Sequence, residues 1–255
     1  MIRLVCATQR SEPEFWTSTL LGRSLNYFRQ YASKFELRLF PSNRVGLTKL
    51  YNQAIEEVKH SPRILVFVHD DIHFFDLFWP ESIEAGLGKF DLIGTLGCKR
   101  HYPYQLSWVH VGKGNAIGNP DREDVSGAVG HFARGELGDA MNVKPSPPDH
   151  LSPFGAQIYF SYFGSPGQRV VLLDGMLLAC RSETLFENNV RFDERYNFHF
   201  YDMDICRQFE QKQLRLGTWP VSVLHGSHGS YGSGFIEEYP KYVDKWNIQD
   251  AWPMR

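Results

Sequence analysis

An uninterrupted apolar stretch, Ile64–Val68, ends abruptly in three polar residues, His69, Asp70 and Asp71. A short run rich in β-branched residues is typical of a strand that is buried on both faces of a sheet. Open α/β sheets bind their ligands at the carboxyl ends of the strands, where these three side chains would lie. Two carboxylates and an imidazole there can hold a divalent cation that also touches phosphate oxygens. Taken alone, such residues are more often a plain turn, because Asp is a common turn residue.

The segments around this stretch alternate between strand and helix patterns. Further strands are predicted at Ile2–Ala7, at Phe35–Phe40 and at Phe90–Gly97. Helices are predicted at 15–31 and from Leu47 to about Val58, and the second has apolar residues at helical spacing: Leu47, Leu50, Tyr51, Ala54, Ile55 and Val58. This alternation predicts an α/β fold with a mostly parallel central sheet that is flanked by helices.

Composition and motifs exclude several classes of protein. The formal net charge of -2 gives no basic field for nucleic acid. No GxGxxG follows the first strand and no GxxxxGK[ST] occurs, so a dinucleotide-binding fold and a P-loop enzyme both lose support. Four cysteines without a CxxC pair indicate free thiols in a reducing compartment. No apolar stretch reaches the length of a membrane span, so we expect a cytoplasmic protein, and peripheral contact with a membrane stays open.

The carboxyl-terminal third supplies further candidate residues. An apolar run from Val170 to Cys180 is interrupted by Asp174 and Gly175, either as a turn between strands or as a carboxylate in a cleft wall. A helix is predicted from Asp202 to about Leu214, and carboxylates at its start also suit the helix dipole. The segment VLHGSHGSYGSG places His225 and His228 in a Gly/Ser loop, which is a flexible loop or a source of metal ligands.

Four segments, in order, resemble the family 2 glycosyltransferases of the GT-A fold, most closely the branch named after a streptomycin-biosynthesis protein. They are SNRVGLTKLYNQAIEE, ILVFVHDDI, LLDGMLLACRSETL with RFDERYNFHFYDMDICRQF, and LHGSHGS. They span most of the chain from Ser42 to Ser230, and residues 98–169 match no motif. We therefore expect one domain, 1–255, with a nucleotide-binding half (1–97), an irregular acceptor-side loop region (98–169) and an acceptor and catalytic half (170–255).

The resemblance implies a metal-dependent enzyme, a hexosyltransferase that acts with inversion. Its donor would be a nucleotide-diphosphate sugar, and its cofactor Mn²⁺ or Mg²⁺. Its acceptor would be a glycan, a lipid-linked molecule or a small molecule, as in polysaccharide biosynthesis.

The resemblance also implies roles for individual residues. Asp71 would bind the metal, with His69 (which replaces the family's first Asp), His225 and His228 beside it. Asp202 would be the general base, in a motif where Tyr201 replaces the family's Glu. The nucleotide-sugar side would comprise Thr8, Arg10, Asn43, Gly46 and Asp70, and the acceptor or sugar side Asp174, Gly175 and Tyr201.

Two other functions are consistent with the sequence. The replacements at His69 and Tyr201 would suit a GT-A-like domain that binds nucleotide sugars or glycans without catalysis. A metal cluster made of His69, Asp70, Asp71, His225 and His228 would suit a nucleotidyltransferase or hydrolase, which would not need Asp202.

Overall fold

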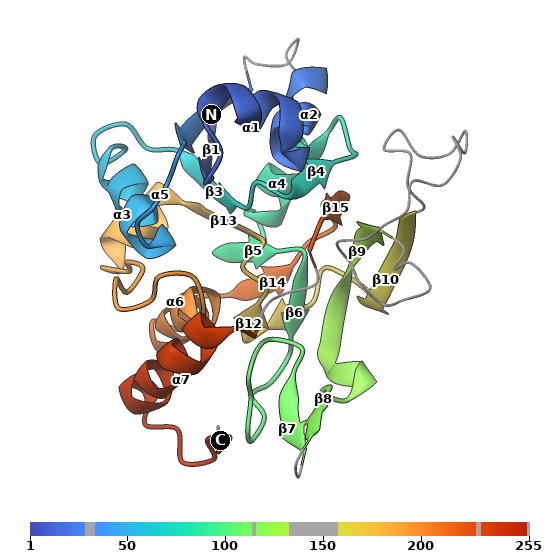
Figure 1. Cartoon of the computed structure of the whole chain (residues 1–255), viewed down its shortest axis with the longest axis vertical. Helices are drawn as coiled ribbons and strands as arrows, with labels where there is room; N and C mark the ends of the chain where they lie inside the picture. The colour runs from blue at the N-terminus through green and yellow to red at the C-terminus, as the bar shows by residue number, and fades with distance from the viewer. Residues whose placement is uncertain (29–33, 114–115, 133–157, 228–230, 254–255) are drawn as a thin grey trace.

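A computed structural model describes residues 1–28, 34–113, 116–132, 158–227 and 231–253. The described residues form two sheets around one hydrophobic core (Figure 1). None of the described helices is both long and apolar enough to cross a membrane.

The larger sheet has seven strands in the order β11–β14–β5–β13–β3–β1–β2. β1, β2 and β3 pair in parallel, β13 is antiparallel to both β3 and β5, and β14 is parallel to β5. Because β11 is antiparallel to β14, five of the seven strands share one direction, and the prediction of a mostly parallel sheet is confirmed. The strands are β1 (Ile2–Ala7), β2 (Phe35–Phe40), β3 (Ile64–Val68), β5 (Leu92–Gly94), β11 (Arg169–Val170), β13 (Leu177–Arg181) and β14 (Leu216–Thr218).

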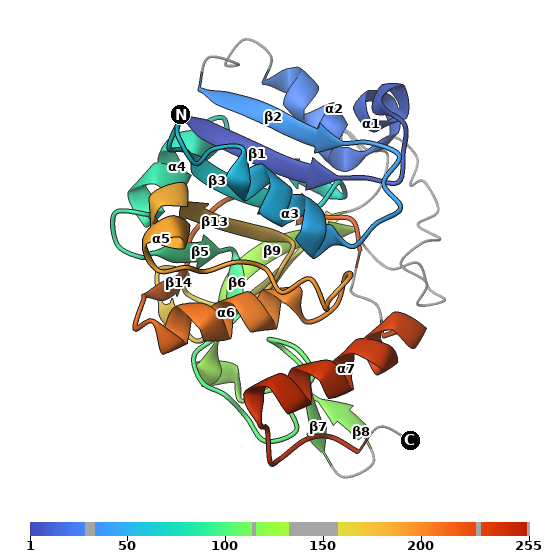
Figure 2. The same cartoon turned by 90° about the vertical axis from the view of Figure 1, so that its left-hand side faces the viewer.

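Helices cover both faces of this sheet, as Figures 1 and 2 show. α3, α5 and α6 lie on one face, and α1, α2 and α4 lie on the other. The helices are α1 (Glu12–Ser18), α2 (Leu20–Tyr27), α3 (Leu47–Glu56), α4 (Trp79–Gly86), α5 (Ser182–Glu187), α6 (Tyr201–Gln211) and α7 (Ser233–Trp246). The α/β class predicted from the alternating pattern is confirmed.

β3 lies inside the larger sheet, and all five of its side chains are buried. On the face that α3 covers, the ring of Tyr51 packs against Phe67 and Phe192, with centroids 4.7 and 5.1 Å apart. The ring of Tyr201 joins this group 5.9 Å from Tyr51. Aromatic packing therefore fixes the first residue of α6 against the centre of the sheet.

The smaller sheet has the strand order β12–β6–β9–β15–β4, with β10 paired to the outside of this path. Its strands are β4 (Ile72–Phe74), β6 (Leu96–Cys98), β9 (Val125–Phe132), β10 (Ile158–Gly164), β12 (Leu172–Leu173) and β15 (Val223–His225). β4 follows β3 directly in the chain, so the turn at 69–71 connects the two sheets.

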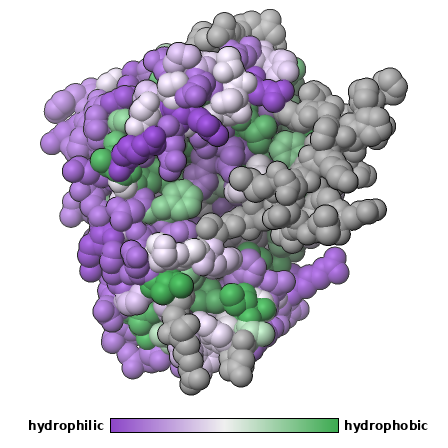
Figure 3. Space-filling view, viewed as in Figure 1, coloured by the Kyte–Doolittle hydropathy of each residue, from purple (hydrophilic) through white to green (hydrophobic). Residues whose placement is uncertain are grey.

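A separate strand pair lies below the smaller sheet in Figure 1. It consists of β7 (Val111–Lys113) and β8 (Ala116–Gly118), and the single turn η2 (Arg122–Asp124) follows it. The described surface in the space-filling view is largely hydrophilic, with apolar residues in several places that include the lower part, where this pair lies (Figure 3).

Three sequence predictions need correction. The helix expected over 15–31 is divided into α1 and α2, because Thr19 is extended and its hydroxyl accepts a hydrogen bond from the Gly22 N–H (3.0 Å). The segment 98–169 is only partly irregular where it is described, because it contains β7 to β10 beside the stretch 99–110, which has no helix or strand. The strand expected within 90–97 is two strands, β5 and β6, in different sheets. The remainder of the middle segment, 133–157, lies outside the described residues.

α7 was not predicted, and Pro240 within it is a residue that normally breaks helices. A buried polar network joins it to α6. The Asp204 carboxylate, which is fully buried, accepts hydrogen bonds from Lys245 Nζ (2.7 Å), Trp246 Nε1 (2.9 Å) and Gln208 Nε2 (2.8 Å). Lys245 also pairs with Asp193 at 2.7 Å.

We expect Lys245→Met to lower the free energy of unfolding by about 2–3 kcal/mol, because it leaves the buried Asp204 carboxylate without its cation. Urea denaturation would measure the change. The matched control is Lys241→Met on the same helix, where an exposed lysine donates only to the Arg195 carbonyl among the described residues and the loss should stay within about 0.5 kcal/mol. Equal effects of the two substitutions would contradict the assigned role of Lys245.

Candidate active site

A cleft of about 640 Å³ opens where the carboxyl end of β3 meets the smaller sheet and the start of α6. Eight of the thirteen residues predicted from the sequence line it: His69, Asp70, Asp71, Asp174, Gly175, Tyr201, Asp202 and His225. His228 lies outside the described residues. The other four predicted residues, Thr8, Arg10, Asn43 and Gly46, do not line the cleft.

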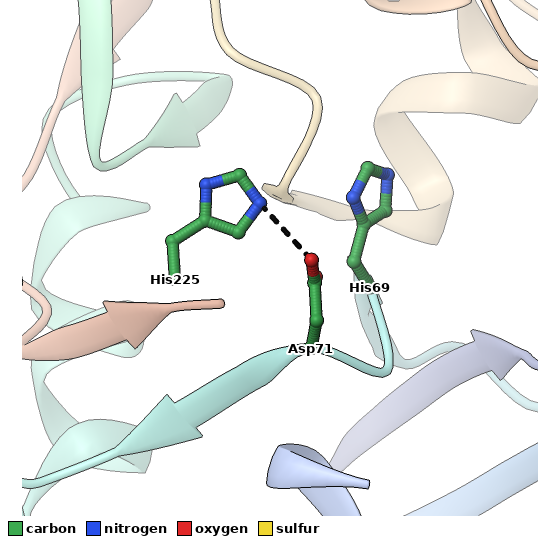
Figure 4. Close-up of side chains that lie close together, drawn as sticks. All are labelled: His69, Asp71 and His225. Carbon is green, nitrogen blue, oxygen red and sulfur yellow. Dashed lines mark ion pairs between the residues drawn. The ribbon is translucent and has the colours of Figure 1, made fainter. Parts of the chain in front are cut away.

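Three potential metal ligands converge in this cleft (Figure 4). β15 pairs antiparallel with β4 in a register that places His225 opposite Ile72, directly beside Asp71. One ligand atom from each of His69, Asp71 and His225 lies within 4.8 Å of the others. His225 Nε2 is 3.5 Å from Asp71 Oδ2. Asp71 Oδ1 is buried and has no hydrogen-bond partner among the described residues.

These three residues fit a divalent cation. A buried carboxylate oxygen without a partner is costly unless an ion or a donor satisfies it. Two imidazoles and one carboxylate are ligands that suit Mn²⁺ and the later transition metals better than Mg²⁺, which prefers oxygen ligands only. With neutral imidazoles the ligand set carries one negative charge, so a bound dication would keep a net positive charge toward a phosphate group.

Tyr201 connects this cluster to the strand turn at 174–175. Its hydroxyl donates a hydrogen bond to the Gly175 carbonyl (2.7 Å) and lies 2.7 Å from His69 Nε2. The exposed ring of Phe198 covers the outer side of His69, with ring centroids 5.7 Å apart and an interplanar angle of 26°. His69 is thus held between one buried and one exposed aromatic residue.

Asp202 lies on the first turn of α6, facing the cleft. Its carboxylate accepts hydrogen bonds from the N–H groups of Gly175 (3.2 Å) and Met203 (2.9 Å). Burial, with the nearby Asp174 carboxylate, raises the pKa of Asp202 to about 7. A carboxylate with a pKa near neutrality is suited to accept a proton from a substrate hydroxyl.

Asp174 lies beside Asp202, and both of its oxygens are engaged. One accepts a hydrogen bond from the Trp108 indole (2.5 Å) and the other from the Met176 N–H (2.8 Å). Asp174 and Gly175 do form the turn between β12 and β13, and the same turn contributes to the cleft wall. Both interpretations of this motif therefore hold, and Asp174 positions Trp108 on that wall.

The residues predicted for the nucleotide side lie next to Asp70, at the carboxyl ends of β1 and β2. The Thr8 hydroxyl donates to Asp70, and burial raises the pKa of this carboxyl although Thr8 opposes the shift. The backbone N–H of Asn43 donates to the Thr8 carbonyl (2.8 Å), and the Asn43 side chain holds both backbone groups of Val45. Arg10 is exposed beside this group. Direct contact of these residues with a nucleotide stays a prediction.

Gly46 and Asn52 have local structural roles. A Cβ at Gly46 would lie 2.7 Å from the Asn197 side-chain oxygen, so only glycine permits this approach at the start of α3. The Asn52 amide bonds the Phe192 carbonyl (2.8 Å) and N–H (3.0 Å), and therefore fixes the loop before α6.

Glu238 shapes the cleft from α7, although no sequence motif singles it out. This buried carboxylate accepts hydrogen bonds from the backbone N–H groups of Asn197 (2.7 Å) and His199 (2.8 Å). The constraint continues into Phe200, a non-glycine residue with φ of +59°, just before Tyr201. Glu238 was missed because the helix that carries it was not predicted.

The smaller sheet adds further residues that were not predicted. His131 on β9 lies opposite His225 on β15 and contacts the Ser161 hydroxyl at 3.1 Å. Tyr231 contacts His110, and both residues also line the cleft. These side chains come from strands and loops that meet distant segments, and no local sequence signal reveals that pairing.

No family model matches the sequence, and no curated protein matches it. Solved structures match over 97% of this chain at low identity. They include GalNAc-T7 with UDP, GalNAc and Mn²⁺ (TM-score 0.49, 12% identity, 49% of that chain covered). They also include S. aureus TarS 1-349 (TM-score 0.43, 12% identity) and its complex with UDP (TM-score 0.42, 14% identity), each covered over 66% of its length. This chain therefore spans about half to two thirds of the length of these proteins. Because the TM-scores lie below 0.5, its function has to be derived from the cleft itself.

We expect the protein to bind Mn²⁺ more tightly than Mg²⁺, and Asp71→Asn to weaken Mn²⁺ binding by at least about tenfold, because the substitution removes the only anionic ligand of the cluster. Isothermal titration calorimetry would measure both affinities. The matched control is Asp76→Asn, which removes a carboxylate outside the cleft and keeps the oxygen that caps the Phe78 N–H. Unchanged Mn²⁺ affinity in Asp71→Asn would refute the ligand assignment.

We also expect Asp202 to destabilise the metal-free protein as the pH rises. Its pKa of about 7 in the folded state exceeds the unfolded value of about 3.9. Between these values the folded state binds more protons, so the free energy of unfolding falls with increasing pH. Asp202→Asn should match the wild type near pH 4 and be more stable at pH 8, by up to about 4 kcal/mol. Urea denaturation of both proteins from pH 4 to 8 in a chelator tests this, and parallel curves would disprove it.

Proposed function

We propose that this chain is a metal-dependent inverting glycosyltransferase with a GT-A type fold, which moves a sugar from a nucleotide-diphosphate donor to an acceptor hydroxyl. The observation that carries the proposal is the arrangement of one cleft. The ligand cluster of His69, Asp71 and His225 lies at its β3 end, and Asp202, with a pKa of about 7, lies at the start of α6.

A divalent cation held by the three ligands would neutralise negative charge on the leaving diphosphate. The work of the protein's own residues centres on Asp202. In its ionised form, this carboxylate takes the proton of the acceptor hydroxyl as the oxygen attacks the anomeric carbon. The bond from that carbon to the diphosphate oxygen breaks on the opposite face of the sugar, which inverts the configuration. The N–H groups of Gly175 and Met203 hold the Asp202 carboxylate in place.

The cleft offers different surroundings for the anionic donor and for the acceptor, which supports sugar transfer between them. The anionic donor would lie by the metal ligands and Asp70, whose carboxylate accepts a hydrogen bond from the Thr8 hydroxyl. The acceptor would enter along the wall of Trp108, Phe198 and Tyr231, which offers aromatic surface of the kind that packs against sugar rings. Hexosyl transfer, a glycan, lipid-linked or small-molecule acceptor, a role in polysaccharide biosynthesis and the streptomycin-biosynthesis-like branch are expectations from the family resemblance.

Asp202→Asn should lower kcat for sugar transfer by about 10²–10⁴-fold, because the amide cannot accept the proton of the acceptor. Donor binding should persist, because the metal ligands are untouched. The donor is first found by a thermal-shift screen of nucleotide-diphosphate sugars with and without Mn²⁺, since a ligand of the native state raises the melting temperature.

The exposed Asp121→Asn serves as a control, because this carboxylate lies outside the cleft and pairs only with Arg100 among the basic side chains described. Transfer that survives Asp202→Asn would exclude Asp202 as the base. Donor hydrolysis or nucleotidyl transfer that is unaffected by Asp202→Asn would favour the nucleotidyltransferase or hydrolase. Metal-dependent donor binding without any turnover would favour a binding domain.

A further inference from the structure

The Tyr201 hydroxyl makes two polar contacts deep in the cleft. It lies 2.7 Å from the Gly175 carbonyl oxygen and 2.7 Å from His69 Nε2, and the tyrosine is almost completely buried. The Tyr201 hydroxyl has only one hydrogen, so it can be the donor in only one of these two contacts.

That single hydrogen fixes the protonation pattern of His69. A backbone carbonyl can only accept a hydrogen bond, so both contacts are satisfied only when Tyr201 donates to Gly175. The hydroxyl oxygen must then accept a hydrogen from His69 Nε2. A neutral imidazole carries one N–H, and therefore the lone pair of His69 lies on Nδ1. Figure 4 shows one ring nitrogen of His69 on the side of Asp71 and His225 and the other nitrogen on the far side.

The surrounding structure is built for this contact. A Cβ on Gly175 would lie 2.4 Å from the Tyr201 hydroxyl oxygen and 2.9 Å from Asp202 Cβ, so only glycine allows the tyrosine to reach across the turn. The rings of Tyr51 and Phe192 pack against Tyr201 from the core, with centroids 5.9 and 6.0 Å away. These neighbours leave the Tyr201 ring little freedom to turn.

We propose that Tyr201 is a positioning residue that holds His69 as the Nε2–H tautomer, so that Nδ1 is directed toward the divalent cation shared with Asp71 and His225. This inference rests on the proposed metal-dependent function. Metal-binding histidines generally donate their second N–H to an oxygen, which fixes the ring and raises its basicity as a ligand. Here a tyrosine supplies that oxygen from the residue next to the candidate base.

Gly175 extends the connection to the base. Its carbonyl accepts from Tyr201 and its N–H donates to Asp202, so one residue contacts both the ligand-positioning side chain and the candidate proton acceptor. Tyr201 stands where the resembled family has Glu, and His69 stands where it has its first Asp. In this proposal the two replacements work together, because Tyr201 orients His69.

The test uses Tyr201→Phe, which removes the hydroxyl and keeps the ring that packs in the core. We expect its Mn²⁺ affinity to fall by about tenfold, as measured by isothermal titration calorimetry. The matched control is Tyr196→Phe, another buried tyrosine, whose hydroxyl has no hydrogen-bond partner among the described residues and lies outside the cleft lining. Mn²⁺ affinity should not change in this control.

A second readout reports the tautomer directly and needs no metal. Long-range ¹H–¹⁵N correlation spectra of the metal-free protein should show His69, identified by the signal missing in His69→Gln, as a pure Nε2–H imidazole. In Tyr201→Phe the same signals should change to a mixture of tautomers. An Nδ1–H pattern in the wild type, or unchanged Mn²⁺ affinity in Tyr201→Phe, would overturn the proposal. A wild type that binds no Mn²⁺ would refute the metal-dependent function instead, while the spectra would still test the tautomer.

Discussion

The burial of β3 between β1 and β13 is the constraint on which the rest of the structure depends. Its five apolar side chains occupy both faces of the larger sheet, so the strand has no freedom to shift its register without exposing them. The chain becomes polar only at His69, where it leaves the sheet. Because the strand is fixed, the backbone of the next three residues is fixed as well, and the cleft forms around this end of the strand.

The second requirement is that distant segments meet this end. β4 carries the chain from the turn at 69–71 into the smaller sheet, and β15 pairs with it so that His225 reaches Asp71. From the other side, the ring of Tyr201 is held in the core by Tyr51 and places α6 against the strand. The cleft is therefore a junction of two sheets and one helix start, with a polar group contributed by each.

Local patterns explain how much of this could be predicted. β1, β2 and β3 were predicted to the residue, because each is a short apolar or alternating run bounded by clear breaks. His69, Asp71, Asp202 and His225 were recognised as candidates because ordered motifs carried them. The smaller sheet was not foreseen, since its strands at 72–74, 96–98 and 172–173 are too short for a periodic signal and pair with distant segments. The contact between Tyr201 and His69 also depends on that distant packing, and no local pattern encodes it.

The Glu238 carboxylate has a consequence for the order in which the cleft is completed. It receives the N–H donors of the loop before Tyr201, and it belongs to α7, which follows the other described helices and strands along the chain. During synthesis on a ribosome, the turn at 69–71 and even α6 emerge before this carboxylate does. The left-handed conformation of Phe200 is unfavourable for a non-glycine residue, so we expect it to form only when α7 docks. The geometry around Asp202 is thus completed late, because it requires α7 to fold back onto the loop before α6.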